Sequence, residues 1–290
     1  MEDFKIDKDP ILKINRIWIP ANRLNEGLEN ASRKNVESIF VIPAHNEEKL
    51  ALDFSHMKSN RQVKALEITA PLGNDSKIEG IYDLKKMIRL SYFEYDRFPL
   101  DNSKLISLKY LYTHYSKNLE TNNSLKLISN LEYLKIWYLN TNNCLLFNGL
   151  TKLKKLDITW GNISSLYGLQ FLPILNSVSL YGLKNITSIE ELLLNSKILN
   201  IDIEKCKNIS DNSFAVGSDY LERLYIDNIN TLSFISRLTN IRFLSFNKCE
   251  SNDLSYLIQL PTLQKVWFPD KKRYSLKMND INTFLSQKNR

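Results

Sequence analysis

The sequence contains few of the residues on which disulfide scaffolds, metal sites and flexible chains depend. Its 290 residues include three cysteines, three histidines, eight glycines and eight prolines. Three cysteines are too few for a disulfide framework, and so little glycine and proline excludes a fibrous or disordered chain. The histidines lack metal-ligand spacing, and no glycine-rich phosphate loop, GxSxG or HExxH motif occurs. We therefore expect a protein that is not an enzyme and holds no cofactor or metal.

Long apolar runs are also missing. No run approaches the roughly 18 apolar residues that cross a bilayer. The first residues, MEDFKIDKDPILKINR, are charged and lack the apolar centre of a signal peptide. These absences predict a cytoplasmic protein without membrane contact. Abundant Asn, Ile, Lys and Leu are typical of an AT-rich genome and favour a bacterial origin.

A short apolar pattern recurs along nearly the whole chain. The spacing apolar-x-x-apolar-x-apolar occurs twelve times, at intervals of 20 to 27 residues. Its copies begin at residues 14, 36, 63, 87, 108, 131, 153, 175, 198, 221, 241 and 263. Between copies, SSLYGLQFLPIL from Ser164 and NDLSYLIQLPTL from Asn252 align with their leucines three residues apart, a spacing that suits a 3₁₀ or short helical turn. Each copy is therefore predicted to form one strand and one returning turn.

These motifs resemble the leucine-rich-repeat family, whose repeats of 20 to 29 residues read L-x-x-L-x-L-x-x-N/C-x-L. Units of about 22 residues are most like the internalin-like class, and Cys206 and Cys249 stand at the N/C position of their repeats. The resemblance implies an α/β leucine-rich-repeat solenoid. Its parallel β-sheet would line the concave face, and 3₁₀ or short helical turns would form the convex face.

The resemblance also implies one domain over residues 1–290, with residues 1–13 as an N-terminal cap and about twelve repeats over 14–268. Residues 269–290 would form a C-terminal cap with a helix. Because solenoid ends need closing, Ile281, Phe284 and Leu285 are predicted on one face of that helix, against the last repeat.

Alternate residues of a strand point to opposite faces of the sheet. If the apolar anchors are buried, the second, fourth and sixth residues after the first anchor face the concave surface. The rule selects 36 positions, three in each of the twelve repeats. Eleven of them are aromatic, whereas the other 254 residues hold 20 of the 31 aromatic residues. Aromatic residues are enriched at interface hot spots, although they also favour strands and stabilise sheets through cross-strand pairs. The densest group is Phe93, Tyr110, Tyr112, Tyr133 and Trp137, with His114 beside it.

The concave positions differ from the whole chain in charge. The chain carries +7, with a pI near 9.1. The concave positions carry six cations, namely Arg16, Arg89, Lys135, Lys155, Arg223 and Lys265. They carry five anions, namely Glu67, Asp157, Asp202, Glu204 and Asp227. The later repeats, which hold four of these acids, would attract a basic protein segment and repel a phosphate backbone.

We therefore predict a non-catalytic module that binds a partner protein through its concave aromatic face. One form of this function is a bacterial immunity protein, or antitoxin, whose partner is a toxin domain. The alternatives are an RNA-binding solenoid, in which aromatics stack on bases, and an exported internalin-like adhesin. The nearly neutral concave face disfavours nucleic acid, and the missing signal peptide disfavours export. The predicted partner-binding residues are Phe93, Tyr110, Tyr112, His114, Tyr133, Lys135, Trp137, Asp157, Tyr181, Asp202, Glu204, Arg223, Tyr225, Asp227, Phe243 and Trp267.

Three further motifs receive structural interpretations. The HNEE sequence at 45–48 opens an irregular insertion that reaches Asn60, and we interpret it as a solvated loop. The tripeptides NIS, NIT and NIS at 162, 185 and 208 match the N-glycosylation sequon. Because they recur at nearly one repeat position, they are predicted to belong to the repeat itself and to remain unmodified. The three cysteines are expected to be buried free thiols.

Overall fold

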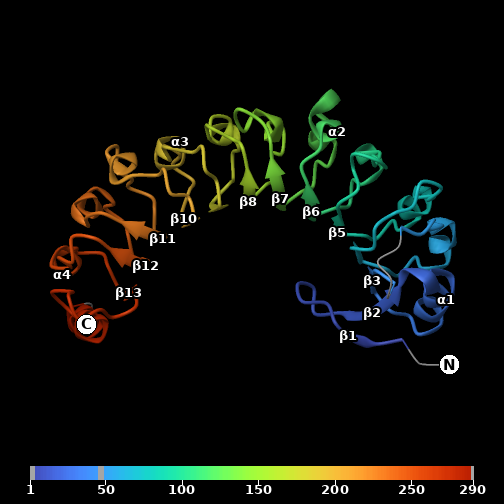
Figure 1. Ribbon diagram of the computed structural model, residues 1–290, viewed down its shortest axis with the longest axis horizontal. Helices are drawn as coiled ribbons and strands as arrows, with labels where there is room; N and C mark the ends of the chain where they lie inside the picture. The colour runs from blue at the N-terminus through green and yellow to red at the C-terminus, as the bar shows by residue number, and fades with distance from the viewer. Residues whose placement is uncertain (1–3, 45–48, 289–290) are drawn as a thin grey trace. The chain divides into compact units, whose positions relative to one another are not determined.

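The computed structural model describes residues 4–44 and 49–288, so HNEE at 45–48 lies outside the described residues. The chain divides into two compact units, Met1–Leu134 and Lys135–Arg290. The strands are arranged in the sheet in the order of the sequence. In each unit, Figure 1 shows the strands along one side of the ribbon and the helical turns along the other.

The first unit contains a sheet that is parallel from its second strand onward. Its strands are β1 (Ile6–Lys8), β2 (Asn15–Pro20), β3 (Ser38–Ile42), β4 (Ala65–Ile68), β5 (Arg89–Tyr92) and β6 (Tyr110–His114). Strand β1 pairs with β2 in the antiparallel direction. The boundary between the units falls within β7 (Tyr133–Leu139).

The second unit continues the same pattern with parallel strands. They are β8 (Lys155–Gly161), β9 (Ser177–Tyr181), β10 (Asn200–Glu204), β11 (Arg223–Ile229), β12 (Phe243–Cys249) and β13 (Lys265–Trp267). From β3 to β13, every strand begins two residues after the first apolar anchor of its repeat, and β2 begins one residue after it. The apolar pattern therefore located each strand of the repeats.

Short helical turns return the chain between strands. The α-helices are α1 (Leu24–Arg33), α2 (Lys117–Glu120), α3 (Glu190–Leu193), α4 (Tyr256–Gln259) and α5 (Met278–Lys288). The 3₁₀ turns are η1 (Ala21–Arg23), η2 (Phe54–Ser59), η3 (Glu79–Asp83), η4 (Asn102–Lys104), η5 (Thr121–Leu127), η6 (Leu145–Phe147), η7 (Leu169–Phe171), η8 (Asp211–Phe214) and η9 (Ser233–Arg237). Leucine spacing of three therefore produces mostly single 3₁₀ turns, as the pattern predicts.

The core of each repeat lies between its strand and its turn. In β7, Leu134 and Ile136 are completely buried, and so is Phe147 of the following turn η6. Burying each such side chain stabilises the fold by about 1.5–3 kcal/mol. Because one repeat cannot enclose these residues alone, stacking of neighbouring repeats is required.

Asparagine side chains tie successive repeats together. The side-chain amide of Asn130 donates to the backbone oxygen of Ile106 at 2.7 Å. Asn185 and Asn208, two of the sequon asparagines, donate in the same way to the preceding repeat, at 3.3 and 2.5 Å. The recurrence of the sequon therefore has a structural role, because these bonds satisfy backbone carbonyls that the strands leave unpaired.

The ends of the chain are closed differently. In the first unit, β1 adds an antiparallel strand beside β2. In the second unit, α5 buries Ile281 and Leu285, whereas Phe284 is 44% exposed. Phe284, three residues after Ile281, lies on the same side of the helix but at the edge of the buried stripe, which leaves its side chain partly exposed.

The three cysteines are buried and free. The thiols of Cys206 and Cys249 lie against backbone oxygens of preceding repeats, at 3.6 Å from Leu180 and 3.9 Å from Asn230. Burial raises the pKa of the Cys206 thiol. These cysteines therefore serve as small core residues with weak S–H donors.

Candidate partner-binding face

The face of the sheet opposite the core is called here the open face, and it is formed by the second, fourth and sixth residues after each first anchor. Strand register brings equal positions of neighbouring repeats into rows. Asp157 of β8 lies opposite Ser179 of β9, which lies opposite Asp202 of β10. Asp202 in turn lies opposite Tyr225 of β11. Side chains far apart in sequence thus become direct neighbours on this face.

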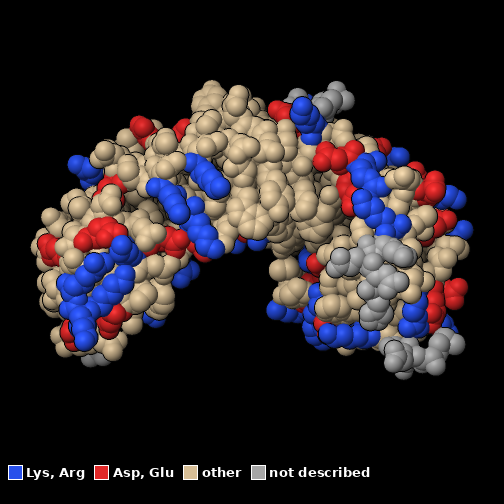
Figure 2. All heavy atoms as spheres, viewed as in Figure 1, with Lys and Arg blue, Asp and Glu red and all other residues tan. Residues whose placement is uncertain are grey.

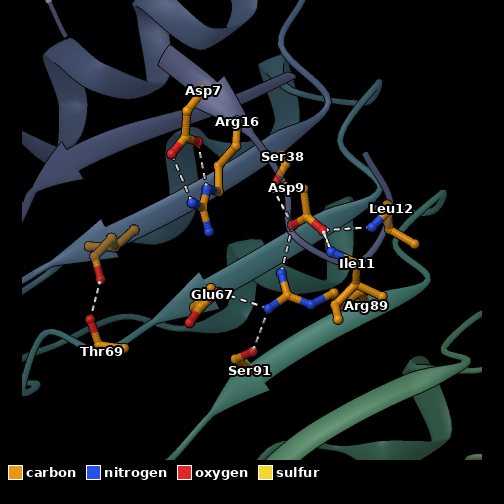
Figure 3. Close-up of polar contacts among 11 residues, drawn as sticks. Asp7, Asp9, Ile11, Leu12, Arg16, Ser38, Glu67, Thr69, Arg89 and Ser91 are labelled. Atoms are coloured by element: carbon orange, nitrogen blue, oxygen red, sulfur yellow. Dashed lines mark hydrogen bonds and ion pairs between the residues drawn. The ribbon is translucent and has the colours of Figure 1, made fainter. Parts of the chain in front are cut away.

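In the first unit, the N-terminal segment covers part of the open face. Asp9 is completely buried and its carboxylate accepts a 2.7 Å hydrogen bond from Nη1 of Arg89 (Figure 3). It also accepts from the Ser38 hydroxyl at 3.0 Å and from the backbone amides of Ile11 and Leu12 at 2.9 and 2.8 Å. Arg89, only 4% exposed, further donates to Glu67 at 2.8 Å.

Arg16, Glu67 and Arg89, which were counted among the concave charges, are therefore engaged within the first unit and are not among the groups that a partner can reach. Arg16 forms a two-point ion pair with Asp7 at 2.9 and 3.0 Å, and that bond lowers the pKa of the Asp7 carboxyl. These ion pairs neutralise the charges of Arg16, Glu67 and Arg89 within the first unit. A buried cation needs a partner carboxylate within hydrogen-bond distance, and the segment before β2 supplies both Asp7 and Asp9.

Beyond this covered part, the predicted aromatic residues of the first unit are in contact with one another. The Tyr112 and Tyr133 rings meet edge to face at 5.3 Å between centroids, and Tyr110 meets Tyr133 at 6.4 Å. Phe93 lies 4.8 Å from the His114 ring. Partial burial lowers the pKa of His114 and thus favours the neutral imidazole. All five side chains remain partly exposed.

Trp137, the sixth predicted member of that group, belongs to the second unit. The ammonium group of Lys135 lies 4.9 Å from its ring centroid. At the far end of this unit, the Arg223 guanidinium lies 5.1 Å from the Phe243 ring, and Trp267 on β13 is half exposed. Lys135 and Trp137 therefore lie at one end of the second unit, and Phe243 and Trp267 at the other.

The four acids of the second unit have different surroundings. Asp157 is only 9% exposed and lies 3.7 Å from the Lys155 ammonium. Asp227 accepts from the Tyr225 hydroxyl at 2.8 Å, from the Asn247 amide at 2.5 Å and from the backbone amide of Lys205 at 2.8 Å. Burial and the bond to Asp227 raise the pKa of Tyr225 to about 12. Asp227 is thus largely committed to holding neighbouring repeats together.

Asp202 and Glu204 are the two acids left for a partner. Both are partly exposed, and neither carboxylate has a hydrogen bond or ion pair with any side chain in the described part of the chain. Burial is the main cause that raises the pKa of Asp202, with Asp157 adding to it and Lys155 and Arg223 opposing. Anions that are partly desolvated without a partner gain from an incoming cation.

Two aromatic side chains were not predicted to lie on this face, because each is the seventh residue after the first anchor of its repeat, one residue beyond the last position that strand alternation selects. Tyr138 and Trp160 adopt left-handed backbone angles, with φ of 59° and 56°. Their rings stack at 5.4 Å between centroids. Gly182 and Lys205, at the same position of the next two repeats, also have positive φ. An alignment of the repeats would have shown Tyr, Trp, Gly and Lys there, and the glycine signals a left-handed turn.

A hollow lies beside this stack on the open face of β8, β9 and β10, with a volume of about 380 Å³. We call it the β8–β10 hollow. The hollow is lined by Lys135, Asp157, Thr159, Trp160, Ser179, Tyr181 and Glu204. It exists because β9 carries small residues, Ser177 and Ser179, between strands with larger side chains. Carboxylates, an amine and aromatic rings thus line the same hollow.

Comparison with solved structures identifies the fold. The chain is similar to an internalin (inlF) from Listeria monocytogenes, with a TM-score of 0.58 and 17% identity over 87% of this chain and 73% of that one. The fold is a leucine-rich repeat. The predicted family resemblance and α/β repeat architecture are thereby confirmed. No protein-family model matches the sequence, and no curated protein matches it.

TLR13 in the TLR13–ssRNA13 complex is also similar, with a TM-score of 0.52 and 16% identity over 92% of this chain. This chain spans 44% of that protein. At these identities the leucine-rich-repeat likeness concerns the fold alone, since one fold carries many functions.

The described residues contain no candidate for a membrane-spanning helix or a metal centre. Among residues 4–44 and 49–288, no helix is both long and apolar enough to span a membrane. Over the same ranges, no group of three or more His, Cys, Asp or Glu side chains is placed to hold a metal ion.

Proposed function

We propose that this leucine-rich-repeat protein is a non-catalytic module that binds a partner protein through the open face of its sheet. The observation that carries the proposal is the pair of carboxylates, Asp202 and Glu204, which have no hydrogen bond or ion pair with any described side chain and lie beside partly exposed aromatic rings. Aromatic anchors and desolvated charges are what protein interface hot spots contain. The partner's contacting segment is therefore basic.

The second unit supplies the charge and both units supply aromatic surface. On β8 to β11, the second, fourth and sixth positions hold four acids against two cations, Lys155 and Arg223. In the first unit, the tyrosines at 110, 112 and 133 offer large contact area with few rotatable bonds. Such side chains contribute affinity at low entropic cost.

RNA is the competing ligand, and the charge distribution disfavours it. Stacking on aromatics could hold bases, and TLR13 occurs in a complex with a single-stranded RNA. The phosphate backbone needs a row of cations, since backbone contacts dominate affinity. On the open face of the first unit, Arg16 and Arg89 are already buried in ion pairs.

The proposed location is the bacterial cytoplasm, and the proposed partner class includes toxin domains with a basic contact surface. A protein that neutralises such a toxin would bind it with one-to-one stoichiometry and would cover its cationic groups. Free acids on the open face suit that task, because charge complementarity accelerates association. A toxin encoded beside this chain's gene would be recognised directly in the experiment below.

The test is affinity capture from nuclease-treated lysate of the source organism with four baits. They are the wild type, a Tyr110→Ala/Tyr112→Ala variant, an Asp202→Asn/Glu204→Gln variant, and a control that removes two acids elsewhere, Glu190→Gln/Asp280→Asn. All four must give the wild-type circular dichroism spectrum. One stoichiometric protein that the wild type and the control retain and either open-face variant loses is the expected result. Identical capture by all four baits, or a partner that is captured only from lysate left without nuclease treatment, would refute the proposal.

A further inference from the structure

We infer that the end of the open face over β11, β12 and β13 binds an acidic segment of the partner, with a carboxylate held between Arg223 and Lys265. We call Arg223, Phe243, Lys265 and Trp267 the β11–β13 patch. The inference rests on the proposed function, to which it adds a second contact of the opposite charge. The basic segment proposed above and this acidic segment would belong to the same partner.

Charges on the open face of the second unit are sorted by their position along the strands. From β8 to β13, the charged residues two places after the first anchors are all cations, namely Lys155, Arg223 and Lys265. Four and six places after the anchors they are all anions, namely Asp157, Asp202, Glu204 and Asp227. Because these strands are parallel and in register, equal positions form rows across the sheet. The edge where the strands begin therefore favours anionic groups of a partner.

Two cations of this row are available to a partner. Lys155 lies 3.7 Å from the Asp157 carboxylate. Arg223 and Lys265 are exposed, and neither side chain forms a hydrogen bond or ion pair within residues 4–44 and 49–288. Cations that stand in water without a partner carboxylate gain from an incoming one that also brings a second, charge-assisted hydrogen bond.

The acids near these two cations do not cancel them. Glu222 pairs with Arg242 at 3.9 Å and adds no net charge. Asp202 lies opposite Tyr225, on the diagonal from Arg223, and its field partly offsets that cation. Lys265 lies three strands away from Asp202, beyond β11 and β12. The local balance at the β11–β13 patch therefore remains positive.

Strand register brings the two cations to either side of one ring. Phe243 lies opposite Arg223 on β11 and opposite Lys265 on β13. The Arg223 guanidinium lies 5.1 Å from the Phe243 ring centroid, so it leans from β11 over β12. Strands separated by one neighbour are about 10 Å apart, a span that two long side chains can close around one carboxylate. The guanidinium would supply two parallel donors and the ammonium group a point charge.

The next row supplies an apolar contact for the same segment. Ser245 separates Tyr225 from Trp267 in the strand register. Trp267 is half exposed, and the Tyr225 hydroxyl donates to Asp227 at 2.8 Å, which fixes the tyrosine ring. An apolar side chain beside the partner's acidic residue would lie over Ser245 between the two rings. Exposed tryptophan next to arginine is the composition of interface hot spots.

A phosphate could pair with the same two cations, but the surroundings disfavour a nucleic acid. Its backbone carries one charge per nucleotide and needs a continuing row of cations. From Arg223 toward β9, the row continues with Asn200 and Ser177, which are neutral, and Asp202 lies beside it. A short acidic segment of a protein needs only the two cations that are present.

The direct test uses small peptides and needs no partner. Acetyl-Glu-Leu-Glu-amide is titrated into the full-length protein, labelled with ¹⁵N, and the four tryptophan indole N–H signals are followed by NMR. Acetyl-Gln-Leu-Gln-amide is titrated in parallel, because it has nearly the same shape without the charge. A Trp267→Phe variant assigns the signal, and Trp18 and Trp160 serve as internal references. We expect a saturable shift of the Trp267 signal with a dissociation constant on the order of millimolar, and little response to the glutamine peptide.

Variants localise the binding. Arg223→Gln and Lys265→Gln should each weaken binding of the acidic peptide about threefold to fivefold, because each removes one charge-assisted contact at an exposed position. Arg237→Gln removes an exposed arginine from the turn η9 and should leave binding unchanged. Asp202→Asn/Glu204→Gln should bind the acidic peptide at least as tightly as the wild type, because it removes negative charge beside Arg223.

The capture experiment provides the second test, with Arg223→Gln/Lys265→Gln as a fifth bait that should lose the partner. The inference is overturned by full retention of the partner on that bait, by no saturable shift of the Trp267 signal, by an equal shift with the glutamine peptide, or by tighter binding of a short oligouridylate. If one of these occurs while capture still yields a partner that needs Asp202 and Glu204, the proposed function stands and the acidic contact falls. If the acidic peptide binds as expected and no bait captures a partner, the patch is selective for acidic segments and the proposed function falls.

Discussion

Arg89 and Arg223 are both the second residue after the first anchor of their repeats, but they have opposite surroundings. Arg89 is buried in the first unit and pairs with Asp9 and Glu67. Arg223 is exposed in the second unit and lies over the Phe243 ring. Identical residues at identical repeat positions thus have different roles, which depend on whether the N-terminal segment covers them.

Replacing Arg89 by Met should lower the free energy of unfolding by about 3–5 kcal/mol, because the change leaves the buried Asp9 carboxylate without its cation. Urea unfolding followed by circular dichroism measures the change. Arg223→Met is the matched control and should alter the free energy of unfolding by about 0.5 kcal/mol or less. Similar values for the two variants would show that the Asp9–Arg89 pair does not stabilise the first unit.

His114 gives the first unit a defined pH response. Burial against Phe93 lowers the pKa of the folded-state imidazole below the unfolded value near 6.5. Below that value the unfolded chain binds more protons, so the free energy of unfolding should fall as pH drops from 7 toward the folded-state pKa. Above pH 7 the contribution is complete.

The measurement is urea unfolding of the wild type and of His114→Phe between pH 5 and 8. The variant keeps an aromatic ring and removes the titrating group, so the difference between the two proteins isolates the histidine. A difference that does not vary with pH would exclude His114 as the source of any acid sensitivity.

At the scale of elements, the left-handed residue after the strand shapes the binding face. Gly182 has φ +67°, and a Cβ atom added there would lie 2.5 Å from Cδ1 of Trp160. The glycine therefore makes space for the indole that walls the β8–β10 hollow. At Tyr138 and Trp160 the same angle is adopted by residues with side chains, which costs about 1 kcal/mol or more per residue.

Gly182→Ala should reduce the free energy of unfolding by about 1–3 kcal/mol, because it combines an unfavourable backbone angle with a clash against Trp160. It should also move the Trp160 indole N–H signal in the NMR spectrum. Ser177→Ala, on the same strand at an ordinary extended angle, is the control and should affect neither quantity appreciably. An unshifted Trp160 signal in Gly182→Ala would show that the glycine does not position the indole.

Strands and turns could be predicted from the sequence because they depend on local spacing. Leu131, Leu134 and Ile136 repeat the same three anchors as every other unit, and their burial requires a strand at that place. The cover over Arg16 and Arg89 could not be predicted in this way. It depends on a pairing of Asp9 with Arg89 across 80 residues, and charge type alone does not select one carboxylate among many.

The candidate site was predicted only where it obeys strand alternation. Tyr181, Asp202 and Glu204 were placed on the open face because the rule of alternate residues applies within β9 and β10. Tyr138 and Trp160 stand just beyond the sixth position, where a left-handed turn changes the direction of the side chain. Asp157 and Asp227 face the open side as predicted, but neighbouring groups hold them in bonds that only the tertiary structure reveals.

At the scale of the whole molecule, opposite charges are interspersed on the surface. Figure 2 shows blue and red side chains close together on each unit, and an area free of both over the turns that follow β7 and β8. Among the residues of these turns, Leu145, Tyr167 and Phe171 are exposed. The net charge of +7 therefore says little about any one surface, and the local balance on the open face decides which partner is attracted.

Stability should be local along the chain, because each repeat contacts mainly its neighbours. Phe246 of β12 is completely buried and stacks on Phe268 at 4.9 Å. Phe246→Ala should cost about 3–5 kcal/mol and, in native-state hydrogen exchange, reduce protection in β11, β12, β13 and α5. Strands β2 to β6 should keep their wild-type protection. Ile39→Ala, which empties a buried position of β3, should give the reverse pattern. If either substitution lowers protection equally in both units, the chain unfolds as one cooperative body and the repeats do not act as a chain of nearest neighbours.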